Sequence, residues 1–246
     1  MFRTFPKPHG SFFIFAKMSL KNAVVFWTLA LFLLTFELIS SIEYHVISKK
    51  IFPIFNSLSR SVTNTISGRI FRNISFFISC LGVYCTYICF IYFSRRLKFG
   101  KRIIVIVCLI GLAFCGIISS VSLAIFMFLT RNSNADIVFA AHSIYFVSQI
   151  GFHCFVTRMS FERRKLYKRI SHYVDYVLIL CVSITLIFHF FTFYTTNNDL
   201  VYNVFSIFEF LSLVLIFIKY LLAGFSVLGA NMYNSHRIRH HEPKFV

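Results

Sequence analysis

Residues 103–129 read IIVIVCLIGLAFCGIISSVSLAIFMFL and contain no charged side chain. A helix of about 20 apolar residues can cross the roughly 30 Å of hydrocarbon in a bilayer. The stretch is therefore long enough to span a membrane. Five other stretches of the chain are also predominantly apolar and about 20 residues long. The six predicted spans lie near Asn22–Ile42, Ile74–Phe93, Ile103–Leu129, Ile137–Thr157, Val174–Tyr194 and Val201–Leu222.

The composition of the whole chain also indicates a membrane protein. Of its 246 residues, 58% are hydrophobic, 13% are charged and 34 are phenylalanine, and the mean hydropathy is +0.76. These values exclude an ordinary soluble domain, which carries about 25% charged residues, and a disordered chain, which has low hydrophobicity. Membrane strands alternate apolar and polar residues, whereas these runs are continuously apolar. The sequence predicts an all-α, polytopic membrane helix bundle with six transmembrane helices.

The distribution of basic residues predicts the orientation. The net charge of +17 comes from 25 Lys and Arg against 8 Asp and Glu. On the side that holds both termini, the basic residues are Arg3, Lys7, Lys17, Lys21, Arg95, Arg96, Lys98, Lys101, Arg102, Arg158, Arg163, Arg164, Lys165, Lys168, Arg169, Arg237, Arg239 and Lys244. The opposite side has Lys49, Lys50, Arg60, Arg69, Arg72 and Arg131, and Lys219 falls within the last span. Because cytoplasmic loops carry the excess of Lys and Arg, both termini are predicted to be cytoplasmic. The expected partners are anionic lipid headgroups at the cytoplasmic face and other membrane proteins, and not nucleic acid.

This topology divides the chain into three parts. Residues 1–21 are a basic cytoplasmic N-terminus, residues 22–222 are the six-helix transmembrane domain, and residues 223–246 are a basic cytoplasmic tail. Within the domain, residues 43–73 leave the membrane on the non-cytoplasmic side. Loops of this length are uncommon and often functional. The loop is therefore interpreted either as a partly folded lid on the bundle or as a plain connector.

The few polar side chains inside the predicted spans are the candidate functional site. Ionisable groups at membrane depth are costly and usually face the bundle interior or a wet cavity. The candidates are Glu37 in the first span, His142, Gln149 and His153 in the fourth, and Glu209 in the last. The three fourth-span residues follow one another at steps of seven and four, which places them on one helix face. They either line a cavity open to lipid headgroups or protons, or tie helices together by hydrogen bonds.

Small residues form a stripe along each of two neighbouring spans. The stripe of the second span consists of Ser75, Ser79, Gly82, Thr86 and Cys89. The stripe of the third span consists of Cys108, Gly111, Cys115, Ser119 and Ser122. Small residues at this spacing let two helices approach closely in lipid. The pattern predicts an antiparallel hairpin in which the second and third spans pack through these two stripes.

No sequence motif favours an enzyme, a metal site or a cofactor, although catalytic activity is left open. The two histidines of the fourth span are about 16 Å apart along a helix, at 1.5 Å per residue, which is too far to share a metal. The seven cysteines all fall within spans, and Cys85 and Cys89 have no His or acidic residue at ligand spacing. All four prolines lie outside the spans, so the broken helices of many transporters are not expected. The prediction is therefore no catalytic residue, no metal and no cofactor.

Three stretches of the chain, in the first loop, the fourth span and the last span, together resemble the pattern of a known family. The first loop carries residues 53–55, PIF, and then residues 68–74, GRIFRNI; the fourth span leads from Asp136 to residues 141–143, AHS. The last span carries residues 203–210, NVFSIFEF, in which a glutamate precedes an aromatic residue. Together these stretches resemble the six-span Frag/DRAM/Sfk family. That family contains the damage-regulated autophagy modulators (DRAM), the post-GPI-attachment-to-proteins factor and the Sfk protein.

The resemblance covers nearly the whole chain and implies a function. It implies a protein of lysosomal or Golgi-type endomembranes that influences autophagy or lipid handling. The first loop lacks the Thr-His-Cys element of the GPI-remodelling branch, and His142 lies six residues after Asp136, where the family holds the two closer. Both differences favour the autophagy-modulator branch, so we expect a non-enzymatic or lipid-binding modulator. The alternatives are a GPI-anchor lipid remodelling factor in the Golgi and a divergent chemoreceptor-like membrane protein.

Overall fold

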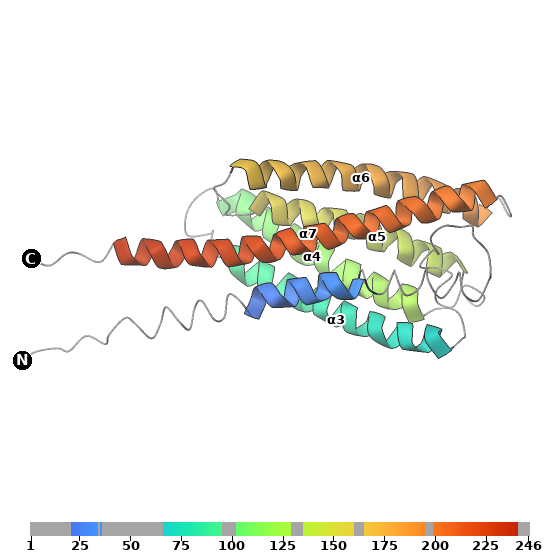
Figure 1. Ribbon diagram of the computed structural model, residues 1–246, viewed down its shortest axis with the longest axis horizontal. Coiled ribbons are helices and arrows are strands. Elements are labelled where there is room, and N and C mark those ends of the chain that lie inside the picture. Colours follow the sequence, from blue (N-terminus) through green and yellow to red (C-terminus); the bar gives the residue numbers. More distant parts are fainter. Residues whose placement is uncertain are drawn as a thin grey trace, which may run out of the picture.

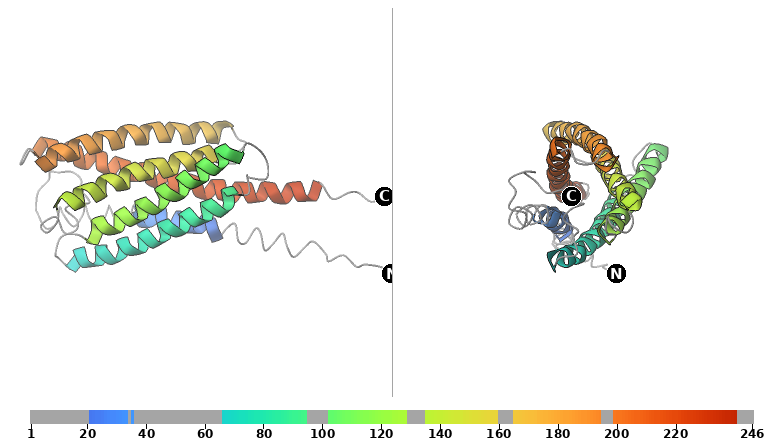
Figure 2. Two further views of the ribbon diagram at one scale, coloured as in Figure 1. Left: turned by 180° about the vertical axis from the view of Figure 1, so that it is seen from behind. Right: turned by 90° about the vertical axis from the view of Figure 1, so that its right-hand side faces the viewer.

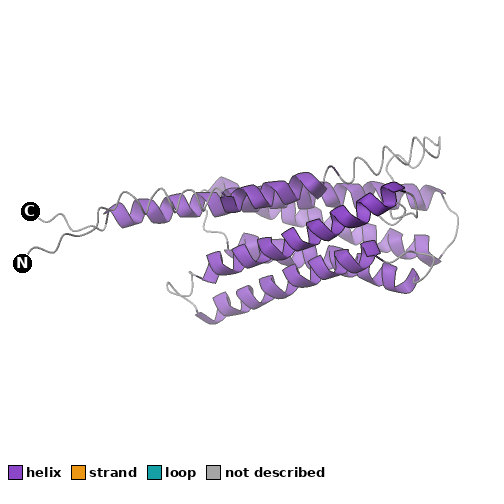
Figure 3. Cartoon of the chain, turned by 90° about the horizontal axis from the view of Figure 1, so that it is seen from below, coloured by secondary structure: helices purple, strands orange, loops and turns teal. Residues whose placement is uncertain are grey.

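The computed structural model describes residues 21–33, 35, 66–94, 102–128, 135–159, 165–194 and 199–240, all of which are helical (Figure 3). The helices are Lys21–Leu33, α3 (Ile66–Ser94), α4 (Arg102–Phe128), α5 (Ala135–Met159), α6 (Lys165–Tyr194) and α7 (Asp199–His240). Helices α3 to α7 are each long and apolar enough to cross a membrane. The predicted multi-pass membrane helix bundle is therefore confirmed. The first predicted span is described only in its first part, and its remainder lies outside the described residues.

The helices follow one another around a ring in chain order (Figure 2). Helix α3 packs on α4, α4 on α5, α5 on α6 and α6 on α7. The helix Lys21–Leu33 closes the ring, because Trp27 donates a hydrogen bond to the carbonyl of Leu221 in α7, at 3.4 Å, and Phe32 meets Phe77 of α3 edge-on. A contact between α5 and α7 crosses the ring. The buried interior is therefore shared by helices from both ends of the chain.

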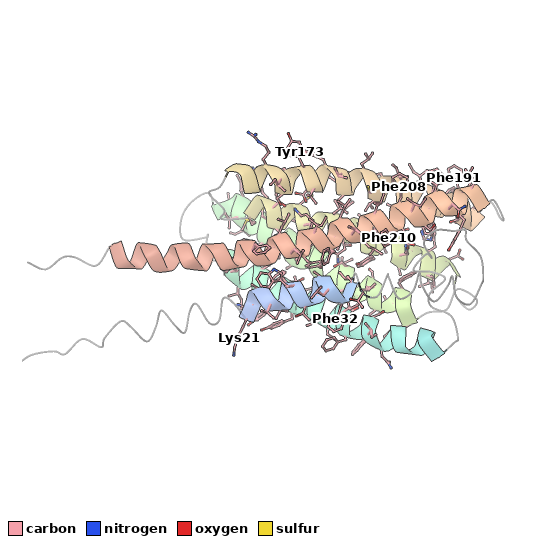
Figure 4. The ribbon with its side chains drawn as sticks, viewed as in Figure 1. Lys21, Phe32, Tyr173, Phe191, Phe208 and Phe210 are labelled. Atoms are coloured by element: carbon pink, nitrogen blue, oxygen red, sulfur yellow. The ribbon has the colours of Figure 1, made fainter. Side chains whose placement is uncertain are left out.

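The outer surface of the bundle is apolar. Large side chains such as Phe114, Leu180 and Tyr176 are 60–68% exposed. Tyr173 of α6 points away from the other helices in the same manner (Figure 4). Soluble monomers rarely expose a contiguous apolar surface of this extent. In lipid the same surface carries no penalty, and it accounts for the high content of phenylalanine and other apolar residues.

The predicted hairpin of the second and third spans is confirmed, but one of its two stripes was assigned to the wrong neighbour. A Cβ on Gly82 of α3 would lie 2.6 Å from Ser120 Oγ of α4, and a Cβ on Gly116 of α4 would clash with Thr86 of α3. By contrast, a Cβ on Gly111 would clash with Phe155 of α5. The third-span stripe thus faces α5, and Gly116 and Ser120, on the adjacent face of α4, meet α3. Both faces of α4 carry small residues because this helix packs closely on two neighbours.

Several helices extend beyond the predicted spans. Helix α6 begins at Lys165 rather than at Val174, and α7 continues through the predicted tail to His240, past the rest of the bundle (Figure 1). Helix α3 begins at Ile66, inside the predicted 43–73 loop, whose preceding residues lie outside the described part. No proline interrupts these extensions, and a helix that leaves the lipid can continue with polar residues in the headgroups. Hydrophobicity therefore marked the membrane-embedded part of each helix and not its ends.

The first described helix and α7 also bear on the orientation. The Lys21 end of the first helix lies at the same end of the bundle as the extension of α7 (Figures 1 and 4). An even number of crossings would place both chain termini on one side of the membrane, as the basic residues predict. The cytoplasmic identity of that side stays a prediction from the charge distribution.

The close approach at Gly116 gives a first testable prediction. Gly116→Val adds three carbons where a single Cβ already meets the Thr86 side chain, so we expect a loss of stability of about 1–3 kcal/mol from overpacking. Thermal unfolding of the purified protein in detergent micelles measures this loss. Val121→Ile, on the exposed face of the same helix, is the control. Its midpoint of thermal unfolding should equal that of the unchanged protein. Equal midpoints for Gly116→Val and Val121→Ile would contradict close α3–α4 packing.

Candidate functional site

One face of α5 carries a continuous row of buried polar side chains. His142, Tyr145, Gln149, His153 and Thr157 follow one another at steps of three or four residues, which keeps them on one helix face. Each is at most 4% exposed. The sequence predicted that His142, Gln149 and His153 share a face, and the structure places all three there. We call these five residues the α5 polar row.

Near the start of α5, the row meets α7 through a histidine and a glutamate. His142 Nε2 lies 2.6 Å from Glu209 Oε1, and neither side chain is exposed to solvent. A contact of this length needs a proton between the two atoms, whether the pair is ionic or neutral. Each partner offsets the desolvation of the other, since an isolated buried charge would cost several kcal/mol. The contact therefore holds α5 against α7 and stores one shared proton in the bundle interior.

A second histidine and several aromatic rings surround this pair. The ring of His189, from α6, lies 4.2 Å from the ring of His142, centroid to centroid, and stacks on Phe205 of α7 at 5.0 Å. Phe146 and Phe126 lie 4.9 and 5.1 Å from His142. These rings enclose the His142–Glu209 contact within the bundle interior. Three helices thus contribute to one cluster of proton-binding groups.

The middle of the α5 polar row is connected to α4 and α7. The Gln149 amide donates to Ser119 Oγ of α4 at 3.4 Å and exchanges hydrogen bonds of 3.3 Å with the Tyr220 hydroxyl of α7. One turn further, the ring of His153 meets the ring of Tyr220 edge-on at 4.7 Å. Among the described residues, neither ring nitrogen of His153 has a hydrogen-bond partner. His153 is therefore a fully buried polar group whose hydrogen-bonding capacity is unused.

The far end of the row meets a buried lysine. Lys219 Nζ of α7 lies 2.6 Å from Asp175 Oδ1 of α6. The same ammonium donates to Thr157 Oγ1 at 2.5 Å, to Ser171 Oγ at 2.8 Å and to the Ser171 carbonyl at 3.3 Å. Thr157 and Ser171 are also hydrogen-bonded to each other, at 3.0 Å. A buried charge needs a countercharge and further hydrogen bonds to be tolerated, and Lys219 has both.

The structure brings together some of the predicted site residues and separates others. His142 and Glu209 are in direct contact. Gln149 and His153 line the same row, two and three turns along the helix, and do not touch that pair. Glu37 lies outside the described residues. Two of the predicted residues, His142 and Glu209, therefore form a direct contact. Gln149 and His153 belong to the same α5 polar row but not to that contact.

Three important residues were not among the predicted site residues. The sequence signal for Lys219 was its presence inside an apolar span, which by itself marks a residue that needs a partner. Asp175 is the second residue of the predicted fifth span, but helix α6 begins ten residues before it, at Lys165. His189 lies within the predicted fifth span, and the sequence alone does not show that its ring meets that of His142.

The described residues include no group of three or more His, Cys, Asp or Glu side chains arranged to hold a metal ion. What the cluster around His142 can do chemically is accept, share and release protons. No model of a known protein family, no curated protein and no solved structure matches the chain. The family resemblance therefore rests on the sequence stretches alone, two of which supply the residues of the His142–Glu209 contact.

Proposed function

We propose that this chain is a multi-pass endomembrane protein of the autophagy-modulator type, which acts without catalysis by binding membrane lipid. The observation that carries the proposal is the His142–Glu209 contact. It joins the AHS stretch of α5 to the NVFSIFEF stretch of α7, the two intramembrane parts of the family resemblance. Residues that define a family pattern and also meet in the fold are the ones on which a shared function is expected to depend.

The burial of this contact supports a binding role over an enzymatic one. An acid–base pair in an active site must reach its substrate within hydrogen-bonding distance. His142 and Glu209 are both fully buried, and aromatic rings pack around the histidine. The outer surface, by contrast, presents apolar side chains suited to lipid tails. At the predicted cytoplasmic end, the exposed Lys21, Arg158 and Arg169 are placed to attract anionic headgroups.

The proposal is tested in cells from which the gene has been deleted. Loss of the protein should change autophagic flux, measured as the turnover of a lipid-conjugated autophagy marker with and without a lysosomal inhibitor. The unchanged protein should restore flux, and Glu209→Gln should not, because the carboxylate that shares the proton with His142 is lost. Tyr176→Phe, which also removes one polar group but lies on the exposed face of α6, is the control and should restore flux fully.

The same cells separate this function from GPI-anchor remodelling. Surface levels of GPI-anchored proteins, measured by flow cytometry, should be unaffected by the deletion and by Glu209→Gln and His142→Ala. If the deletion lowered those levels and left flux unchanged, the Golgi remodelling function would replace the one proposed. Localisation of the tagged protein to lysosomal or Golgi-type membranes is the accompanying expectation, and tags at both ends should be accessible from the cytoplasm.

A further inference from the structure

The α5 polar row crosses most of the apolar thickness of the bundle. From His142 to Thr157 the row extends about 22 Å, at 1.5 Å per residue, compared with about 30 Å of hydrocarbon in a bilayer. Successive members are about 4.5–6 Å apart along the helix axis. Soluble and membrane proteins alike seldom bury an uninterrupted polar line of this length, so its continuity calls for an explanation.

Both ends of the row carry proton-binding pairs. At one end, His142 shares a proton with Glu209, and His189 lies against His142. At the other end, Thr157 accepts a hydrogen bond from Lys219, which is paired with Asp175. Residues from α5, α6 and α7 take part at each end. The row therefore connects two groups of ionisable side chains, whose α7 members are about 15 Å apart along that helix at 1.5 Å per residue.

The middle of the row contains the group that is hardest to explain by stability alone. His153 is fully buried, and within the described ranges neither of its ring nitrogens is hydrogen-bonded. Burying an imidazole without partners is costly, and an apolar residue of similar size would avoid that cost. One turn to one side of His153 lies Gln149 with Tyr220, and one turn to the other side lies Thr157 with Lys219. His153 occupies the position where a carrier between these two groups would have to be.

We propose that the α5 polar row is a proton relay that conducts protons across the membrane. Each hop breaks one O–H or N–H bond and forms another: an imidazole accepts a proton at one nitrogen and releases one from the other, and a hydroxyl does the same at its oxygen. Gln149 orients the Tyr220 hydroxyl through its 3.3 Å hydrogen bonds. A single bridging water between successive turns would complete each hop. One proton leaves for each one that enters, and nothing is oxidised or reduced.

The geometry favours protons over hydrated ions. The members of the row are at most 4% exposed and are packed against aromatic rings and neighbouring helices. A proton passes such a line by exchange between fixed groups and does not need a channel wide enough for a hydrated ion. The relay is a further activity and does not depend on the lipid-binding function proposed above.

Proton flux into vesicles tests the proposal. The purified full-length protein is reconstituted into phosphatidylcholine vesicles containing phosphatidylglycerol, with a pH-sensitive dye inside. A potassium gradient and valinomycin set the membrane potential, and potassium movement balances the proton charge. We expect vesicles with the protein to change internal pH several-fold faster than protein-free vesicles. Equal rates for the two kinds of vesicle would overturn the proposal.

Variants then locate the route. His153→Leu removes the carrier without breaking any hydrogen bond of the described residues, and it should return the flux to that of protein-free vesicles. His172→Leu, at a partly exposed histidine of α6 outside the row, is the matched control and should conduct as the unchanged protein does. Undiminished flux through folded His153→Leu would overturn the proposal. If that variant does not fold, the flux is measured for Tyr145→Phe, which removes only a hydroxyl from the row. Reduced proton flux through this variant would support the relay, and unchanged flux would overturn it.

Discussion

Replacing Lys219 with methionine is expected to destabilise the folded bundle by about 3–5 kcal/mol, the usual cost of leaving a buried charge without its partner. Methionine preserves most of the length and the apolar part of the side chain. It leaves the Asp175 carboxylate, which is 7% exposed, without the ammonium that now lies 2.6 Å away. Thr157 and Ser171 lose a donor as well but keep their hydrogen bond to each other. Unfolding of the purified protein in detergent micelles, by heat or denaturant, measures the change.

A double variant distinguishes the loss of the pair from the exposure of one charge. Lys219→Met with Asp175→Asn removes both charges and should recover most of the lost stability, because a buried ion pair replaced as a whole is often near neutral. Lys21→Met, at an exposed lysine of the first helix, is the control for removal of a positive charge and should have little effect. Full stability of Lys219→Met alone would show that the ion pair does not hold α6 and α7 together.

The sequence predicted the helices well because each one carries its own signal. An uninterrupted apolar run needs no partner to be identified as a membrane span, and all five of the long apolar helices in the described part of the chain match predicted spans. Helix ends were less predictable, as α6 and α7 show, because a helix that leaves the lipid continues in residues that no longer differ from a loop by hydrophobicity.

Contacts between helices depend on how each helix is rotated about its own axis. The local sequence of one helix does not determine this rotation. The third-span stripe was expected to meet α3, but Gly111 faces Phe155 of α5 and Gly116 faces Thr86 of α3. Small residues occur on both faces of α4, so spacing alone could not assign each face to its neighbour. The same limit applies to the site. His142 and Glu209 were recognised separately as costly buried groups, but their contact follows only from how α5 and α7 are turned toward each other.

The His142–Glu209 pair leads to the second large effect. His142→Phe keeps an aromatic ring among Phe126, Phe146 and His189 and leaves Glu209 buried without the ring nitrogen it now contacts. We expect a loss of about 3 kcal/mol, because removing one partner of a buried pair typically costs about 3–5 kcal/mol. Glu209→Leu should cost a similar amount, since it removes the group that satisfies His142 Nε2. Unfolding in the same micelles measures both.

A double variant separates the contribution of the pair from that of its surroundings. If the two side chains act as a unit, His142→Phe with Glu209→Leu should lose less than the sum of the single variants, with a coupling of about 0.5–3 kcal/mol. Additive losses would instead mean that α5 and α7 are held together by the packed aromatic rings and that the 2.6 Å contact contributes no net stability. Repeating the cycle in a His189→Phe background then shows whether the third proton-binding group shares the coupling. A coupling that disappears there would assign the shared proton to all three helices and not to the pair alone.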